Sequence, residues 1–140
     1  MRISTPCLAW KTCLFVFLSV PAFADGTGNI FVSNESDNTV SVINGETFEV
    51  IKTVHTGERP RDMRWHQGNT QLLIATSGSD RIEVLDVKTL EIVNFIEAGE
   101  DPEIFNIDPT GNILVAANED DNEVTVTDLN TGKRIRTIGD

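Results

Sequence analysis

The sequence predicts an all-β protein made of β-propeller blades, which are four-stranded antiparallel sheets, here with a 42-residue repeat. The first observation is a short pattern that occurs three times, in which Val40, Ile82 and Val124 hold the same place at intervals of 42 residues. Each copy alternates aliphatic with polar residues and ends in Asn or Asp, as a β-strand does before a turn. The second observation is that no stretch carries apolar residues at helical spacing over the length of a helix. A strand-rich repeat of about forty residues is typical of propeller blades.

The repeat domain is expected to span residues 25–140, in units 29–57, 58–99 and 100–140. Turns rich in Gly, Asn, Asp and Pro separate the segments that have strand character. The expected strands are residues 29–34, 39–44 and 49–54 in the first unit, 62–66, 71–76, 81–86 and 91–96 in the second, and 103–107, 112–118, 123–128 and 134–138 in the third.

The inner strands favour blades over solvated sheets. Residues 72–75 and 113–117 are apolar at consecutive positions. Both faces of their sheets are therefore expected to be buried, as in a blade packed between two neighbours. A two-sheet sandwich is the alternative, but it does not require a strict 42-residue period.

The strand count predicts an incomplete propeller of one three-stranded and two four-stranded blades. The first unit offers only three strands before its turn at Gly57, and three units are fewer than the roughly four blades of a closed ring. An open array leaves an apolar blade face and strand edges uncovered. We therefore expect closure by the missing blades of a longer protein or by self-association, and we favour the longer protein.

Residues 1–24 have the features of a signal peptide. Arg2 and Lys11 supply positive charge, residues 12–20 form a short apolar run, and small residues close the segment. We expect cleavage before Asp25 and a periplasmic or secreted protein that has no membrane attachment after cleavage. An uncleaved anchor is the alternative.

Composition argues against several classes of site. Both cysteines, Cys7 and Cys13, lie inside the expected signal segment, so the exported chain would have no disulfide, thiolate metal site or covalent haem motif. The chain holds 11 Lys and Arg against 22 Asp and Glu, and such an acidic surface repels nucleic acid and anionic lipid. His55 and His66 are too few for a His-based metal or haem site. No catalytic residue, cofactor or metal is predicted.

Two acidic turns, residues 35–38 and 119–122, occupy the same place in the first and third units. Their oxygens are chemically suited to hard cations. However, they lack the order of a calcium loop, and Asx side chains in turns commonly bond their own backbone. We interpret them as turn caps.

The turns between units carry the candidate binding residues. Arg59 and Arg61 stand 42 residues before Asp101 and Glu103, and Arg64 lies just beyond. In a propeller this turn leads into the innermost strand beside the central channel, so opposite charges are expected at one channel mouth. Two interpretations are open. Either the mouth selects a small polar ligand or partner protein, or these residues form inter-blade ion pairs, which are worth little when exposed.

Residues 30–34 and 37–43 resemble the YVTN repeat of bacterial and archaeal β-propellers. Residues 57–61 and 99–103 resemble that family's G-x-x-P turn between blades, and residues 118–122 its N-x-x-D-N turn. The resemblance extends over nearly the whole chain after the signal segment.

The chain resembles in particular the exported YVTN propellers encoded beside alcohol oxidation systems that depend on pyrroloquinoline quinone (PQQ). It departs from the repeat at residues 65–68, Trp-His-Gln-Gly, where the family has a Ser-Pro-Asp-Gly-like turn. The resemblance implies an exported binding or scaffold propeller, accessory to a periplasmic PQQ-dependent pathway, with a quinoprotein or another protein as partner. The alternative is a propeller enzyme, an oxidoreductase or lactone-type hydrolase, with its site at the channel mouth. The lack of haem, His-cluster and Trp-rich motifs favours binding.

Overall fold

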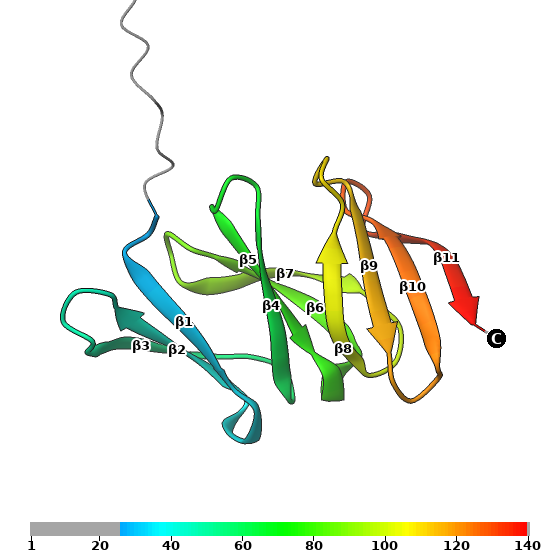
Figure 1. Cartoon of the computed structure of the whole chain (residues 1–140). Helices are drawn as coiled ribbons and strands as arrows, with labels where there is room; N and C mark the ends of the chain where they lie inside the picture. Colours follow the sequence, from blue (N-terminus) through cyan, green and yellow to red (C-terminus); the bar gives the residue numbers. More distant parts are fainter. Residues whose placement is uncertain (1–25, 140) are drawn as a thin grey trace, which may run out of the picture.

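The computed structural model describes residues 26–139, which form three separate antiparallel sheets arranged side by side (Figure 1). Neighbouring strands in sequence are neighbours in each sheet. The first sheet holds β1 (Asn29–Asn34), β2 (Thr39–Asn44) and β3 (Val50–His55). The second holds β4 (Pro60–His66), β5 (Gln71–Thr76), β6 (Arg81–Asp86) and β7 (Glu91–Glu97). The third holds β8 (Pro102–Ile107), β9 (Ile113–Asn118), β10 (Glu123–Asp128) and β11 (Lys133–Gly139).

The predicted fold class is confirmed, and the sandwich alternative is wrong. Each predicted strand exists, and the blades have three, four and four strands. The only helical segments between residues 26 and 139 are two single 3₁₀ turns, η1 (Glu35–Asp37) and η2 (Ser77–Ser79). No helix in this part of the chain is long and apolar enough to cross a membrane. The expected signal peptide, residues 1–24, and both cysteines lie outside the described residues.

Three strands begin earlier than the sequence predicts: β11 by one residue, at Lys133, and β4 and β8 each at a proline. Pro60 opens β4 opposite Thr76, and Pro102 opens β8 opposite Asn118. A bulge follows each proline, so an extra residue enters the inner strand there. Proline is tolerated at the first residue of a strand because the missing N–H need not join the ladder.

The innermost strands define the channel side of the molecule. β4 and β8 lie beside each other, and β1 lies beside β4 (Figure 1). The 42-residue period equates β1 with β5 and β9, so the first blade lacks a described counterpart of β4 and β8. As a result, β1 forms the inner edge of its sheet.

Two apolar layers hold the three blades together, and β5 contributes to both. Leu72 and Ile74 point into the layer shared with the first blade, whereas Leu73 and Ala75 point into the layer shared with the third. The first layer contains Val40, Val42, Val54, Leu72, Ile74, Leu85 and Val87, and the second contains Leu73, Ala75, Ile82, Val84, Ile96, Ala98, Phe105, Leu114 and Ala116. The expectation that a blade buries both faces is therefore confirmed for the central blade.

The turns between blades are fixed by Asx residues in the left-handed conformation. Asn38 and Asp80 both have a φ of 55°. Asn38 Oδ1 accepts the backbone N–H of Arg59, and Asp80 Oδ1 accepts that of Asp101, each at 2.9 Å. Glycine is required at Gly99, where φ is 87° and an added Cβ would lie 2.5 Å from the Asn118 amide nitrogen. These bonds place Arg59 and Asp101 at equivalent points of consecutive blades.

We expect Asp80→Gly to lower the free energy of unfolding by about 1–2 kcal/mol, because the N–H of Asp101 loses a charged acceptor. Glycine adopts a positive φ without strain, so the substitution removes the acceptor without straining the turn. Urea denaturation followed by circular dichroism measures the change. Asp80→Asn is the control, since its Oδ1 can still accept the bond. Equal losses in the two variants would show that the bond contributes nothing.

Candidate functional site

The candidate site lies where the turns between blades enter β4 and β8. Arg59 and Asp101 precede these strands, and both have a positive φ, 53° and 43°. The β1–β2 and β9–β10 turns reach the same end of the blades and bring Glu35 and Glu119 beside them. We call the group Glu35, Arg59, Arg61, Asp101, Glu103 and Glu119 the mouth cluster.

Arg59 joins all three blades. Its Nε lies 3.4 Å from Glu35 Oε1 of the first blade, and one terminal nitrogen lies 3.4 Å from Asp101 Oδ1 of the third. The other terminal nitrogen lies 3.8 Å from Glu103 Oε1. The hydrogen bond to Glu35, with the nearby carboxylate charges, raises the pKa of Arg59 above its ordinary value despite partial desolvation. The guanidinium therefore stays charged.

Arg61 repeats this bridge one residue into β4. A terminal nitrogen lies 3.0 Å from Glu35 Oε1, and the other contacts Glu103 Oε1 as an ion pair rather than as an aligned hydrogen bond. Its Nε is buried and has no hydrogen-bond partner among residues 26–139. Both arginines therefore connect the first blade to the third across the start of β4.

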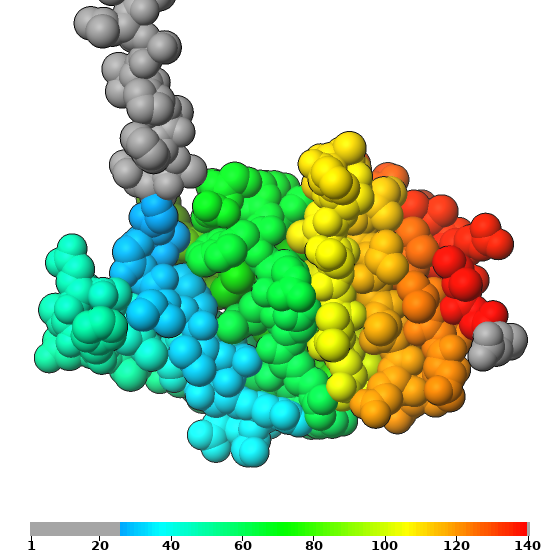
Figure 2. All heavy atoms as spheres, in the orientation of Figure 1, coloured from blue at the N-terminus to red at the C-terminus, as the bar shows by residue number. Residues whose placement is uncertain are grey.

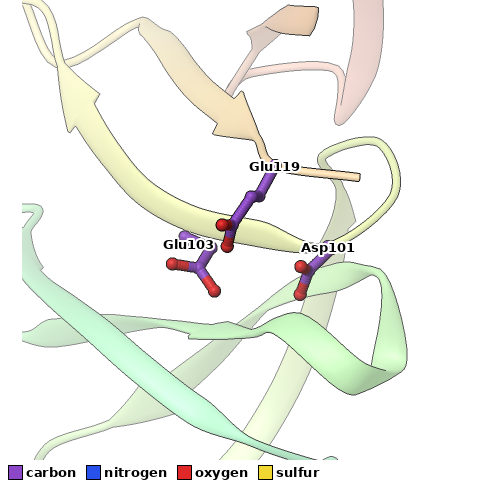
Figure 3. A group of neighbouring side chains, drawn as sticks. All are labelled: Asp101, Glu103 and Glu119. Atoms are coloured by element: carbon purple, nitrogen blue, oxygen red, sulfur yellow. The ribbon is translucent and has the colours of Figure 1, made fainter. Parts of the chain in front are cut away.

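Three carboxyl groups of the third blade face one another (Figure 3). One oxygen each from Asp101, Glu103 and Glu119 lies within 4.8 Å of the others. Burial raises the pKa of Glu103, as do a hydrogen bond with Glu119 and the charges of Glu119 and Asp101, while Arg61 opposes the rise. Glu103 thus holds its proton more tightly than a carboxyl group in solution does.

The structure brings together four of the five residues predicted from the repeat. Arg59, Arg61, Asp101 and Glu103 contact one another, as the inter-blade ion-pair interpretation expected. Arg64 does not join them, because its guanidinium lies 2.6 Å from Asp62 Oδ1 on its own strand.

Sequence reasoning missed two members of the mouth cluster. Glu35 and Glu119 were interpreted as parts of turn caps. The 42-residue period could have identified them, because Glu35 and Glu119 stand two repeat lengths apart, with Ser77 at the middle position. Ser77 has no carboxylate, and its hydroxyl donates to the Arg59 carbonyl instead.

The mouth cluster carries an excess of negative charge. Four carboxyl groups surround two guanidinium groups, so both arginines are already paired. Oxygens of Asp101, Glu103 and Glu119 are the type of ligand that hard divalent cations take, but Arg59 and Arg61 occupy the space beside two of them. The arrangement is suited to a cationic group that adds to the cluster, or to proton transfer at Glu103.

Comparisons with known proteins agree with this architecture. A family model described as "Lactonase, 7-bladed beta-propeller" matches residues 22–135. A solved chain of Kuenenia stuttgartiensis hydrazine synthase is similar in structure, with a TM-score of 0.72 and 23% sequence identity. The match covers 81% of this chain and 33% of that one, so the chain spans about a third of the matched protein, and the likeness is one of fold. No curated protein matches the sequence significantly.

Proposed function

Because the chain belongs to the lactonase family of seven-bladed β-propellers, we propose that it supplies three blades of an exported propeller that binds a partner protein at the mouth cluster. The observation that carries the proposal is the convergence of four carboxyl and two guanidinium groups from three blades. Blade packing alone does not require this, since apolar layers already join the sheets.

The charge of the cluster indicates the kind of partner. Glu35 and Arg59 have side chains that are 48% and 44% exposed, so the outer part of the cluster meets solvent. Both guanidinium groups are neutralised within the cluster, and the remaining carboxylates attract a basic group. We propose a Lys- or Arg-bearing segment of a periplasmic quinoprotein as partner, with this chain accessory to PQQ-dependent alcohol oxidation. The YVTN resemblance and the signal-like residues 1–24 support that assignment.

The test is a binding titration of the purified chain with a periplasmic PQQ-dependent alcohol dehydrogenase at low and high salt. We expect Glu35→Gln with Glu119→Gln to weaken binding about tenfold at low salt, because two attractive charges are removed. Glu46→Gln with Glu49→Gln is the matched control, since these exposed glutamates lie in the β2–β3 turn, away from the cluster. The proposal is contradicted if the Glu35→Gln, Glu119→Gln variant binds as tightly as the wild type. It is also contradicted if the Glu46→Gln, Glu49→Gln control loses as much affinity.

The family match favours a second candidate, hydrolysis of a lactone. Glu103, with its raised pKa and its bond to Glu119, is suited to general acid–base work. Arg61 lies beside it and can polarise a carbonyl oxygen. Lactone hydrolysis followed by alkali uptake at constant pH tests this candidate. Lactone hydrolysis would replace partner binding as the proposed function under three conditions. The wild type must hydrolyse the lactone faster than the spontaneous reaction, Glu103→Gln must abolish this excess rate, and no partner binding must be detected.

A further inference from the structure

We propose that a second site, at the opposite end of β4 and β8 from the mouth cluster, binds a neutral saccharide. The site is a cleft of about 520 Å³ between the second and third blades, within the size range of small-molecule sites. We call it the distal cleft; its lining includes His66, residues 67–69, residues 108–112 and Asn130. Figure 2 shows the dip in the surface between the green β4–β5 turn and the yellow β8–β9 turn.

The position of the distal cleft makes it independent of blades beyond this chain. Both of its walls belong to blades that the structure describes in full, with four strands each. The layer below it is closed by buried side chains, Leu73 and Leu114 among them. The cleft is therefore a feature of the folded blade pair and not an uncovered end of the array.

The side chains of Asn130 and His66 in the distal cleft are neutral, and each has hydrogen-bonding atoms that no group of residues 26–139 uses. Asn130 Nδ2 donates to Asn112 Oδ1 at 3.0 Å, and Asn112 Nδ2 donates to Thr110 Oγ1 at 2.9 Å. This chain of bonds orients the Asn130 amide, whose Oδ1 accepts no bond from residues 26–139. Burial lowers the pKa of His66, so the imidazole is neutral near pH 7 and offers one donor and one acceptor. Neither ring nitrogen has a hydrogen-bond partner in the described part of the chain. Vicinal hydroxyl groups match such a set of neutral donors and acceptors.

The charged groups of the cleft are already satisfied. Arg64 is paired with Asp62 at 2.6 Å. Asp108 accepts the backbone N–H groups of Thr110, Asn112 and Ile113 and the Thr110 hydroxyl. These bonds lower its pKa to about 2, so the carboxylate needs no external cation. A charged ligand finds no free counter-charge. Most of the lining is polar, and its large apolar side chains are Trp65, Ile107 and Pro109, so the cleft suits a polar ligand better than a wholly hydrophobic one.

The experiment is an NMR titration of the ¹⁵N-labelled chain with glucose, maltose, cellobiose and glycerol. We expect saturable shifts of the side-chain amide signals of Asn112 and Asn130 with the sugars at millimolar concentrations, and weaker, non-saturating shifts with glycerol. Asn130→Ala should weaken sugar binding about tenfold, as the loss of one hydrogen bond predicts. His66→Gln, which keeps a neutral donor and acceptor, should bind more tightly than His66→Ala.

Asn122→Gly is the matched control, because Asn122 is an exposed asparagine in the β9–β10 turn, at the other end of the strands, and glycine adopts its positive φ without strain. The dispersion of the backbone amide spectrum verifies that each variant is folded. If His66→Ala unfolds the chain, the comparison of Asn130→Ala with Asn122→Gly decides the question. The proposal is overturned if no sugar gives a saturable shift, if glycerol binds as tightly as maltose, or if the control loses as much affinity as Asn130→Ala. Failure here leaves the mouth cluster and its proposed function untouched, since that site lies at the other end of the strands.

Discussion

Phe105→Ala is expected to lower the free energy of unfolding by about 3–5 kcal/mol, the range for truncating a buried phenylalanine. Phe105 is the largest fully buried side chain in the described part of the chain, at 1% exposure. It extends from β8 into the layer between the second and third blades, beside Leu73 and Ile82. The resulting cavity cannot readily collapse, because the backbone N–H of Phe105 is held by Asp62 Oδ2 at 3.2 Å.

Urea denaturation followed by circular dichroism measures this loss, and Phe105→Leu should cost less because most of the volume remains. Phe95→Ala is the matched control. Phe95 is 60% exposed on β7 and stacks under the Arg81 guanidinium, 5.3 Å from its ring centroid. Its truncation should cost about 0.5–1 kcal/mol, the worth of an exposed cation–π contact. Similar losses for Phe105→Ala and Phe95→Ala would contradict the burial assigned to Phe105.

The fold was predictable because the same strand pattern occurs three times at intervals of 42 residues. β2, β6 and β10 have the predicted bounds, since alternation and a terminal Asn or Asp mark both ends of each strand. The starts of β4 and β8 were not predicted, because Pro60 and Pro102 were assigned to turns. A proline that pairs across a bulge leaves no trace in a simple alternation pattern.

The mouth cluster was only partly predictable. The repeat shows which positions are equivalent in consecutive blades, but it does not show which side chains are close enough to contact each other. Arg59 and Arg61 lie within contact of the third blade, whereas Arg64 is about 10 Å further along β4 at 3.3 Å per residue. Glu35 and Glu119 could be assigned to a site only once the blades were placed beside each other. Alternation likewise gave no sign that Glu83, a polar position of β6, is buried. In a blade that lies between two others, both faces of the sheet are covered, so a polar residue in the alternating pattern can also be buried.

Burial of Glu83 leads to the second large expected effect. Glu83 is 2% exposed. Its Oε1 lies 3.0 Å from Arg81 Nε and 2.5 Å from an Arg81 terminal nitrogen, while Oε2 accepts the N–H of Gly57 at 3.0 Å. The Arg81 side chain is 38% exposed, so water reaches one side of the pair. Glu83 thereby ties β6 to the turn between the first two blades.

Arg81→Met should lower the free energy of unfolding by about 3 kcal/mol, the lower end of the range for leaving one partner of a buried ion pair uncompensated. Methionine keeps much of the apolar stem of arginine, so the loss comes mainly from the carboxylate. Glu83→Gln in the Arg81→Met background should recover most of the stability, because the neutral amide no longer needs a cation and its oxygen can still accept the Gly57 N–H. Urea denaturation of the wild type, both single variants and the double variant gives the coupling energy between the two positions. Additive losses would mean that the guanidinium does not compensate the buried carboxylate, and that the inter-blade turn depends on packing and the Asx bonds alone.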